Sequence, residues 1–220
     1  KKHRVDISKV GVYEGLGMTA VAIDGKLAGL VLYADEIRPY AKELIIETKK
    51  LGVKEWIMLT GDNEQVAKRI AKSVGIENYK HDLKPEEKLE IIKEYKTKKG
   101  LIAMVGDGVN DAASISLADV SFAMGAIGSD TSIEAADIAL MNDKLERIPE
   151  SMILAKKTNQ IVKQCFATWG LTNVVGLFLV VTGHLDPVGA AAFNFVTDFI
   201  PIFNALRVNT LDISVYNNKV

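Results

Sequence analysis

The sequence lacks several features that mark particular classes of protein. Its 220 residues include a single cysteine, Cys165, so an internal disulfide is impossible and a reducing cytosol is expected. A formal net charge of −1 gives no overall positive field, which argues against nucleic acid as a partner. Residues 1–4 are a basic run without a start methionine or a signal-peptide pattern. These absences favour a piece of a longer protein that works without nucleic acid or disulfides.

Charge is also missing from one part of the chain. Between Cys165 and Leu206 the only charged residues are Asp186 and Asp198, whereas charges crowd the first two thirds of the sequence. A stretch this long and this apolar needs either a large soluble core or a lipid bilayer around it. The uneven distribution therefore predicts a soluble part followed by a membrane part.

Two segments of the second part have the length of membrane-spanning helices. Residues 145–163 predict a long amphipathic helix, and residues 165–182 then give roughly 18 uncharged positions, the usual length of a spanning helix. A turn at 183–187 leads to a second, slightly interrupted apolar segment at 188–206. Basic residues precede the first segment and Arg207 follows the second, so the positive-inside rule places both ends in the cytosol. The alternative is a buried helical hairpin in a soluble protein.

What the soluble part does contain is an apolar run that leads into a polar turn. Residues 101–105 predict a buried parallel strand, and the turn 106–111 (Gly-Asp-Gly-Val-Asn-Asp) follows at once. Open α/β sheets bind their ligands at the carboxyl ends of the strands. Asp107 and Asp111 are spaced i, i+4, so they can share one face of the following helix, and such a carboxylate pair suits Mg²⁺ beside phosphate oxygens. The alternative is a polar turn whose aspartates only cap the helix.

Strands and helices alternate through the soluble part with short links. This alternation predicts an α/β fold built on a doubly wound parallel sheet. Asp24-Gly25 adds a hairpin signal between the first two strands. The expected strands are 18–24, 27–33, 55–59, 101–105 and 120–124, and the expected helices are 41–51, 64–74, 84–98 and a short one that ends at 117.

A second polar turn, Thr60-Gly61-Asp62, also follows an expected strand. The Thr60 hydroxyl and backbone N–H groups at Gly61 could hold phosphate oxygens, and Lys88, just inside a helix, could supply a positive charge. Neighbouring strand ends of a parallel sheet open on one crevice, so the two turns are expected to face a common ligand. Taken singly, the residues read as an ordinary turn and a solvated lysine.

An ionisable residue, Asp198, lies inside the second apolar segment. A charge at membrane depth is costly and usually faces a polar cavity or an ion path. Pro201 follows one turn later, and the carbonyl that it frees could add an oxygen ligand. Structural pairing of Asp198 and polar contacts between the helices are the alternatives. The other polar residues that could line the same cavity are Thr172, Asn173, Asn194 and Thr197.

Several motifs in a fixed order resemble those of the P-type ATPases. The resemblance to their phosphorylation domain is carried by Thr60-Gly61-Asp62-Asn63, Pro85-Glu86-Glu87-Lys88 and residues 104–112 (Met-Val-Gly-Asp-Gly-Val-Asn-Asp-Ala). Residues 133–140 (Ile-Glu-Ala-Ala-Asp-Ile-Ala-Leu) and 204–207 (Asn-Ala-Leu-Arg) resemble the heavy-metal-transporting branch. The resemblance covers nearly the whole chain.

The resemblance implies three segments and a set of roles. Residues 1–34 would end the nucleotide-binding domain, 35–144 would form a haloacid dehalogenase-like phosphorylation domain, and 145–220 would add a linker helix, two membrane helices and a cytosolic tail. ATP and Mg²⁺ are the implied cofactors, in a multi-pass membrane protein whose catalytic domain is cytosolic. The implied roles are Mg²⁺ coordination by Asp107, phosphate and metal geometry held by Asp111 and Asn110, phosphoryl binding by Thr60 and Gly61 near Asp62, and charge neutralisation by Lys88.

One family motif is absent from the sequence. The nucleophile of these pumps is the aspartate of Asp-Lys-Thr-Gly-Thr on the central strand of the sheet, and the sequence contains no such motif. We therefore expect an amino-terminal truncation, and we expect this chain alone neither to hydrolyse ATP by the family route nor to transport an ion. A membrane-anchored haloacid dehalogenase-type phosphohydrolase and a non-catalytic regulatory half-protein remain the alternatives.

The transported ion is not identified by the membrane residues. The residues at 171–172, Asn194, Thr197 and Asp198 match none of the patterns of the copper, zinc/cadmium or cobalt branches. The expected partner is therefore a transition-metal cation of the zinc, cadmium, cobalt, manganese or copper class. Because the ligands are rich in oxygen and nitrogen and poor in sulfur, they favour a divalent ion over Cu⁺.

Overall fold

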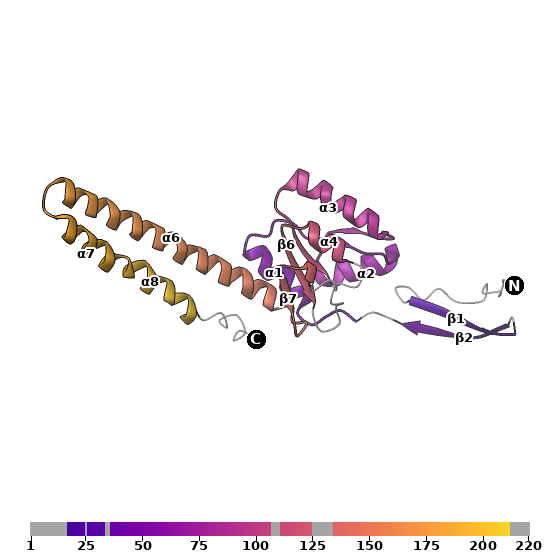
Figure 1. The fold of residues 1–220 in the computed structure, drawn as a ribbon. Helices are drawn as coiled ribbons and strands as arrows, with labels where there is room; N and C mark the ends of the chain where they lie inside the picture. The colour runs from indigo at the N-terminus through magenta and orange to yellow at the C-terminus, as the bar shows by residue number, and fades with distance from the viewer. Residues whose placement is uncertain (1–16, 25, 34–35, 107–110, 125–133, 212–220) are drawn as a thin grey trace. The chain divides into compact units, whose positions relative to one another are not determined.

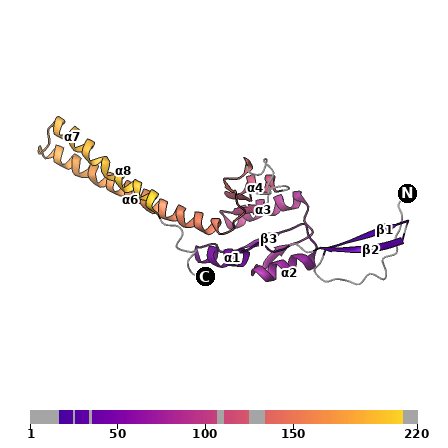
Figure 2. The ribbon, with the colours of Figure 1, turned by 90° about the horizontal axis from the view of Figure 1, so that it is seen from below.

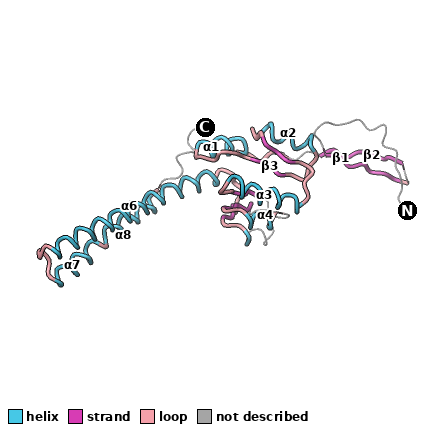
Figure 3. Tube along the Cα trace, turned by 90° about the horizontal axis from the view of Figure 1, so that it is seen from above, coloured by secondary structure: helices cyan, strands magenta, loops and turns pink. Residues whose placement is uncertain are grey.

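The computed structural model describes residues 17–24, 26–33, 36–106, 111–124 and 134–211 (Figure 1). The chain forms two compact units, residues 1–147 and residues 148–220. The first unit holds the strands together with four helices among the described residues, and the second unit is helical, as the colouring by secondary structure shows (Figure 3). The predicted order, an α/β part followed by a helical hairpin, is confirmed.

The first two strands form an antiparallel hairpin. β1 (Gly17–Ile23) pairs with β2 (Lys26–Tyr33), and the turn passes through Asp24, whose φ of 48° is left-handed. The hairpin predicted from Asp24-Gly25 is therefore confirmed in its pairing, while Gly25 lies outside the described residues. Val21, Ile23 and Val31 are exposed in it. A two-stranded ribbon with exposed apolar residues is only marginally stable by itself.

One group of elements in the first unit surrounds a short parallel pair of strands. It contains α1 (Ala41–Lys50), β3 (Ile57–Leu59), α2 (Glu64–Val74) and β4 (Asn78–Lys80). Helix α2 begins where Asn63 Oδ1 accepts from the Val66 N–H at 3.1 Å, and it ends at Gly75, whose φ is 83°. Strand β4, which pairs in parallel with β3, is not among the strands expected from the sequence. Strand β4 has only three residues, and its first and last residues, Asn78 and Lys80, are polar and exposed. It therefore lacks the alternation of apolar and polar residues from which a strand is predicted.

A second group contains the remaining strands of the first unit. It consists of α3 (Pro85–Lys99), β5 (Ala103–Gly106), α4 (Ala112–Leu117), β6 (Val120–Met124) and β7 (Ile138–Leu140). The strands form a parallel sheet in the order β5-β6-β7. Its core consists of Ile115, Phe122, Ala123, Met124 and Leu140, all buried. Strand β7 was not predicted, because a three-residue apolar run is too short to identify.

Apart from the β1-β2 hairpin, the described strands of the first unit form two parallel sheets rather than one continuous sheet. Among the described residues, β3 pairs only with β4, and β5 pairs only with β6, so β3 and β5 are edge strands of their sheets, as are β4 and β7. Figure 2 shows α1, β3 and α2 as one group and α3 with α4 as another. The prediction that the 101–105 strand is buried is wrong, since Ala103 is exposed and Met104 and Val105 are half-buried. An open edge leaves these side chains without the neighbour that would cover them.

The second unit is a helical hairpin. Helix α6 (Arg147–Val181) runs antiparallel to α7 (Pro187–Thr197) and α8 (Phe199–Leu206), and η1 (Arg207–Thr210) follows (Figure 1). The separate helices predicted at 145–163 and 165–182 are one continuous helix, because no glycine, proline or cap interrupts the sequence between them. By length and composition, Arg147–Val181 and Pro187–Thr210 could each cross a membrane.

The two arms of the hairpin meet along a seam of less exposed residues. Gly176 is buried in it, and a Cβ at this glycine would lie 3.0 Å from Cε1 of Phe193. Residues at spacings of three and four lie on one face of a helix, which produces the two matching stripes. On α6 the stripe is Ile161, Cys165, Thr168, Thr172, Gly176 and Leu179, and on the other arm it is Ala190, Phe193, Thr197, Pro201 and Asn204.

Candidate functional site

A charged pair lies beside the carboxyl end of β5. Lys88 Nζ is 2.9 Å from Asp111 Oδ1, and the two side chains are only 16% and 15% exposed. Lys88 is placed there by the start of α3, where Pro85 occupies the first turn and the Lys84 N–H donates to Glu87 Oε2 at 2.7 Å. The lysine is therefore not an ordinary solvated helix residue. It fixes one carboxylate oxygen of the turn after β5.

Close packing holds the backbone of this turn. A Cβ on the buried Gly106 would lie 3.2 Å from Asp111 Cβ and 3.1 Å from Ile115 Cδ1, so only glycine fits without displacing them. The Ile115 N–H donates to the Asp111 carbonyl at 2.7 Å. Asp111 directly precedes α4, and its side chain accepts no capping hydrogen bond. The predicted shared face of Asp107 and Asp111 stays a prediction, because Asp107 lies outside the described residues.

The Thr60 turn is closed by local hydrogen bonds. The Thr60 hydroxyl donates to Asp62 Oδ2 at 2.8 Å and accepts from the Asp62 N–H at 3.1 Å. A Cβ at Gly61 would lie 3.3 Å from the Leu83 carbonyl, so the glycine allows the next loop to approach. Leu83 in turn donates its N–H to the Thr60 carbonyl at 3.1 Å, and the Asp82 N–H donates to the Asp62 carbonyl at 2.8 Å.

These contacts connect the two polar turns through a short piece of chain. The Thr60 turn bonds to Leu83, two residues before α3 begins, and Lys88 one turn into that helix reaches Asp111. Three of the predicted site positions, Thr60, Lys88 and Asp111, thus belong to one contact network. Gly61 and Asp62 complete the first turn. Asp107 and Asn110 lie outside the described residues, so their positions remain predictions.

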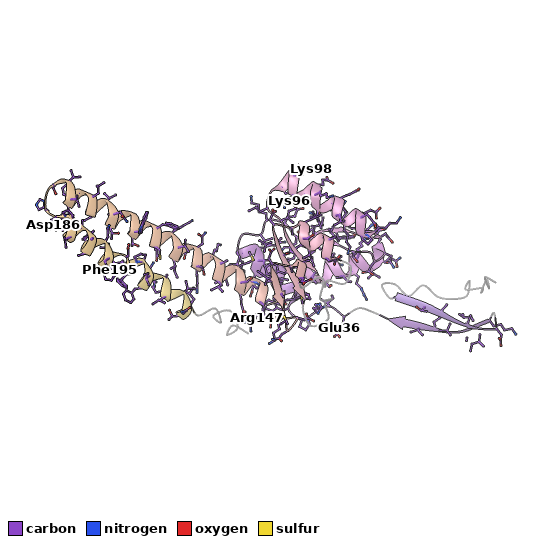
Figure 4. All side chains as sticks on the ribbon, viewed as in Figure 1. Glu36, Lys96, Lys98, Arg147, Asp186 and Phe195 are labelled. Atoms are coloured by element: carbon purple, nitrogen blue, oxygen red, sulfur yellow. The ribbon has the colours of Figure 1, made fainter. Side chains whose placement is uncertain are left out.

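A second ion pair fixes the opposite end of β5. Asp119 Oδ1 is 2.8 Å from Lys96 Nζ, and Asp119 Oδ2 accepts from the Ile102 N–H at 2.9 Å. The Lys96 hydrogen bond, supported by the Ile102 amide, lowers the pKa of the Asp119 carboxyl from its ordinary value. Lys96 and Lys98 of α3 are labelled in Figure 4. Lys98 Nζ pairs with Glu94 Oε1 of the same helix at 2.6 Å. Helix α3 is therefore tied to the β5 sheet at both of its ends.

One polar contact of the sheet was missed by sequence reasoning. The buried Ser121 on β6 donates its N–H at 2.9 Å and its hydroxyl at 2.8 Å to Asp137 Oδ2, and it accepts from the Asp137 N–H at 3.0 Å. This reciprocal set joins the start of β7 to β6. Its only signal in the sequence is an aspartate directly before the short apolar run of β7, within the motif at 133–140.

The polar residues of the membrane hairpin bond mainly to their own helices. Thr172 and Asn173 both donate to the Trp169 carbonyl, at 2.9 Å and 2.7 Å. Thr197 donates to the Asn194 carbonyl at 3.2 Å. Thr172 and Thr197 lie on the seam, whereas Asn173, Asn194 and Asp198 are exposed beside it.

The five predicted ion ligands therefore fall at one level of the hairpin. Gly176 of α6 lies opposite Phe193, and a Cβ there would be 3.9 Å from Asn194 Oδ1, so Asn194 lies next to this part of α6. Because the arms are antiparallel, Thr172, one turn before Gly176, lies across from Thr197, one turn after Phe193. Asn194 and Asp198 are spaced i, i+4 and share a face of their arm.

The donor set beside β5 fits a hard cation better than a soft one. Asp111 offers a partly buried carboxylate, and Gly106 lies directly against Asp111 and Ile115. Carboxylate oxygens are the ligands that Mg²⁺ takes in sites that also hold phosphate. Within the residues that the structure describes, no group of three or more His, Cys, Asp or Glu side chains could hold a metal ion. The second predicted ligand, Asp107, is outside that set.

Comparisons with known proteins agree on one family. The family model of the haloacid dehalogenase-like hydrolases matches residues 4–119. The chain is 38% identical over 203 residues, 91% of its length, to a probable cadmium-transporting ATPase of Staphylococcus aureus, and it covers 25% of that protein. It is 35% identical to a manganese-exporting P-type ATPase of Mycobacterium leprae, with 85% of this chain and 26% of that protein covered.

A solved structure gives the same result for the fold. The crystal structure of a zinc-transporting PIB-type ATPase in the E2.Pi state matches with a TM-score of 0.77 and 30% identity, covering 88% of this chain and 32% of that one. The chain spans about a quarter of the length of the curated relatives above. The chain belongs to the haloacid dehalogenase-like hydrolases, and over most of its length it is similar to the heavy-metal-exporting P-type ATPases.

Proposed function

We propose that this chain is the carboxyl-terminal part of an ATP-driven pump for a divalent heavy-metal cation, working through an aspartyl phosphate formed on polypeptide outside this sequence. The Lys88–Asp111 pair beside the carboxyl end of β5 carries the proposal. Phosphoryl transfer is catalysed mainly by positioning and charge stabilisation. A lysine ammonium that fixes a carboxylate beside a glycine turn is suited to both tasks.

The open edges of β3 and β5 support a nucleophile strand between the two sheets. Both sheets are parallel, and among the described residues β3 and β5 are each paired on one side only. A parallel strand inserted between them would join β4-β3 and β5-β6-β7 into one sheet and would cover Met104 and Val105. Its carboxyl end would emerge between the Thr60 turn and the turn that follows β5. An aspartate at that end would lie beside both turns.

Each side chain of the site then has a distinct task. Thr60 and Gly61 would bind phosphoryl oxygens, with Asp62 holding the Thr60 hydroxyl in place. Lys88 would neutralise charge on the phosphoryl group and orient Asp111. Asp107 and Asp111 would hold Mg²⁺, and Asn110 would support them. Bound Mg²⁺, delivered with ATP, would supply a further positive charge to the phosphate oxygens.

The cation would cross the membrane beside the hairpin at the level of its polar residues. Thr172 and Thr197 on the seam, with Asn173, Asn194 and Asp198 beside it, offer oxygen and nitrogen ligands, which suit a divalent cation better than Cu⁺. The cadmium, manganese and zinc named for the relatives above belong to that class. The domain would face the cytosol of a multi-pass membrane protein. The turn at Asp186, which is labelled in Figure 4, would lie on the opposite side of the membrane.

A chimera tests the proposal. The amino-terminal three quarters of the Staphylococcus aureus cadmium-transporting ATPase would be joined to this chain and reconstituted in proteoliposomes. We expect cadmium-, zinc- or manganese-stimulated ATP hydrolysis and a phosphoenzyme from γ-labelled ATP that is stable in acid. Lys88→Met and Asp111→Asn should each remove both signals, while Lys93→Met, an exposed lysine of the same helix, should keep them.

The chain alone is the second arm of this test. It should form no acid-stable phosphoenzyme, and a labelled band from the chain alone would overturn the placement of the nucleophile outside it. Release of phosphate from p-nitrophenyl phosphate by the chain, without any heavy metal, would favour a phosphohydrolase instead. A chimera that folds and reaches the membrane but shows no metal-stimulated turnover would contradict the pump.

A further inference from the structure

Two contacts along the seam lie on either side of the break between α7 and α8. On the α7 side, Gly176 lies under the ring of Phe193, where a Cβ would approach Cε1 to 3.0 Å. We call this the glycine contact. On the α8 side, Cys165 Sγ donates to the Pro201 carbonyl at 3.3 Å and accepts from Asn204 Nδ2 at 3.4 Å. We call this second set the thiol clasp.

The thiol clasp differs from the other polar contacts of the hairpin. The hydroxyls of Thr168, Thr172 and Thr197 donate to carbonyls of their own helices, whereas the clasp joins α6 to α8. Arg207 Nη1 donates to Asn204 Oδ1 at 3.1 Å and so leaves the amide nitrogen for the thiol. In an apolar surrounding, such a cross-helix bond is favoured because its groups have no water to replace it.

The break itself explains why two contacts are needed. Pro201 has no N–H, so the carbonyl four residues earlier, that of Thr197, receives no helical hydrogen bond from it. The chain therefore bends more easily at Asp198, which separates α7 from α8. A single contact to α6 would hold only one of the two short helices in register.

We propose that the thiol clasp locks α8 in register with α6, and that, with the glycine contact on α7, it fixes the level at which Thr172, Thr197 and Asp198 lie. The lock is a property of the hairpin alone. Its meaning for ion binding rests on the proposed function, whereas its existence does not. Cys165, Asn204 and Pro201 are positioning residues in this view, and none of them is assigned to the cation.

Distances between spin labels in the full chain, reconstituted in lipid nanodiscs without ATP or metal, test the lock. Cys165→Ser is the reference background, because serine keeps a hydroxyl that can donate and accept while removing the only native thiol. Labels at the exposed positions Phe166 and Ile202 report the register of α8 against α6. Labels at the exposed positions Val174 and Val196 report the register of α7.

The clasp variants should move only the α8 distance. In Cys165→Ala we expect the 166–202 distribution to shift and broaden, and the 174–196 distribution to stay as in Cys165→Ser. Adding Asn204→Leu to the serine background, which removes the clasp from the other arm, should give the same result. Thr168→Val is the control on the seam, because the Thr168 hydroxyl bonds to its own helix at Gln164.

The glycine contact should give the opposite pattern. Gly176→Ala in the serine background should shift the 174–196 distribution and leave the 166–202 distribution unchanged. Gly170→Ala, in the same helix but with open space around the added Cβ, should change neither.

Narrow, unshifted 166–202 distributions in both Cys165→Ala and Asn204→Leu would overturn the lock. A simultaneous loss of both distances in these variants would also overturn it, since the hairpin would then unfold as one body. Because no ATP or metal is present, either result is distinct from a failure of the proposed pump.

Discussion

The two units use their polar side chains in opposite ways. In the first unit, Lys88 on α3 reaches across to Asp111 before α4, and both side chains are mostly buried. In the membrane hairpin, Thr172 and Asn173 bond back to the Trp169 carbonyl of their own helix. The first arrangement is assembled between elements, and the second is largely satisfied within a single helix.

This difference is consistent with the two roles proposed above, phosphoryl transfer in the first unit and passage of a cation along the hairpin. Charge stabilisation in phosphoryl transfer is effective when the groups are held in place before the reaction, so a fixed cross-element pair is useful. An ion path needs ligands that bind weakly enough to release the ion. Side chains that rest on their own backbone carbonyls can exchange those bonds for a cation. The hairpin then needs separate contacts, such as the thiol clasp, to hold its arms together.

The largest effect is expected where a charge would lose its partner. Lys88→Met should lower the free energy of unfolding by about 2–3 kcal/mol, because Asp111 would keep a partly buried charge without its cation. Urea unfolding can be followed by the fluorescence of Trp56 in a Trp169→Phe background, which leaves one tryptophan. The exposed Lys93→Met is the control. Equal midpoints for the two variants would show that the pair adds no stability.

A smaller loss is expected from added volume at the same turn. Gly106→Ala should cost about 1–2 kcal/mol, because its Cβ would press against Asp111 and Ile115. The same urea titration measures it. Gly29→Ala, where nothing lies within 4 Å of the added Cβ, should not lower stability through crowding. A Gly106 variant as stable as the Gly29 variant would mean that the turn has room to move.

The hairpin should tolerate the loss of the Thr172 hydroxyl with little change in stability. Thr172→Val is expected to change stability by less than about 0.5 kcal/mol, since its hydroxyl only supplements a helix carbonyl. Thermal unfolding in detergent micelles, followed by far-ultraviolet circular dichroism, measures this change. A large loss would place the Thr172 hydroxyl in a contact between helices.

The smallest effect is expected at an exposed ion pair and only in acid. Lys96 and the Ile102 amide hold the pKa of Asp119 below its ordinary value. The pKa is thus lower in the folded state than in the unfolded state. The stabilisation is present at neutral pH and is lost as the pH falls through the folded pKa. Asp119→Asn should flatten the acid limb of the stability profile, while the exposed Glu90→Gln on α3 should leave it unchanged.

The sequence predicted long elements and polar turns better than short strands. Strands β4 and β7 have three residues each, too few to show a periodic pattern. Helix α6 was predicted as two helices because its composition changes near Cys165, although nothing in the sequence breaks it there. An interruption of the second apolar segment was predicted, and the structure places it at Asp198, three residues before Pro201.

The candidate site shows the same division. Motif spacing brought Thr60, Lys88 and Asp111 to attention, but only the folded chain joins Lys88 to Asp111 at 2.9 Å. The need for glycine at Gly106 also depends on Ile115, nine residues away, packing against it. The Ser121–Asp137 contact had almost no local signal, since Ser121 lies on β6 and Asp137 lies just before β7, 16 residues further along the chain.

By itself, the sequence determined the parallel α/β fold, the apolar hairpin and the residue types of the polar turns, because periodicity, charge and turn chemistry act over a few residues. The tertiary structure alone decided which side chains meet: Lys88 with Asp111, Gly176 with Phe193, and Cys165 with Asn204. Such pairs depend on how distant elements pack, and the packing is set by the shape and burial of the whole unit rather than by any local pattern.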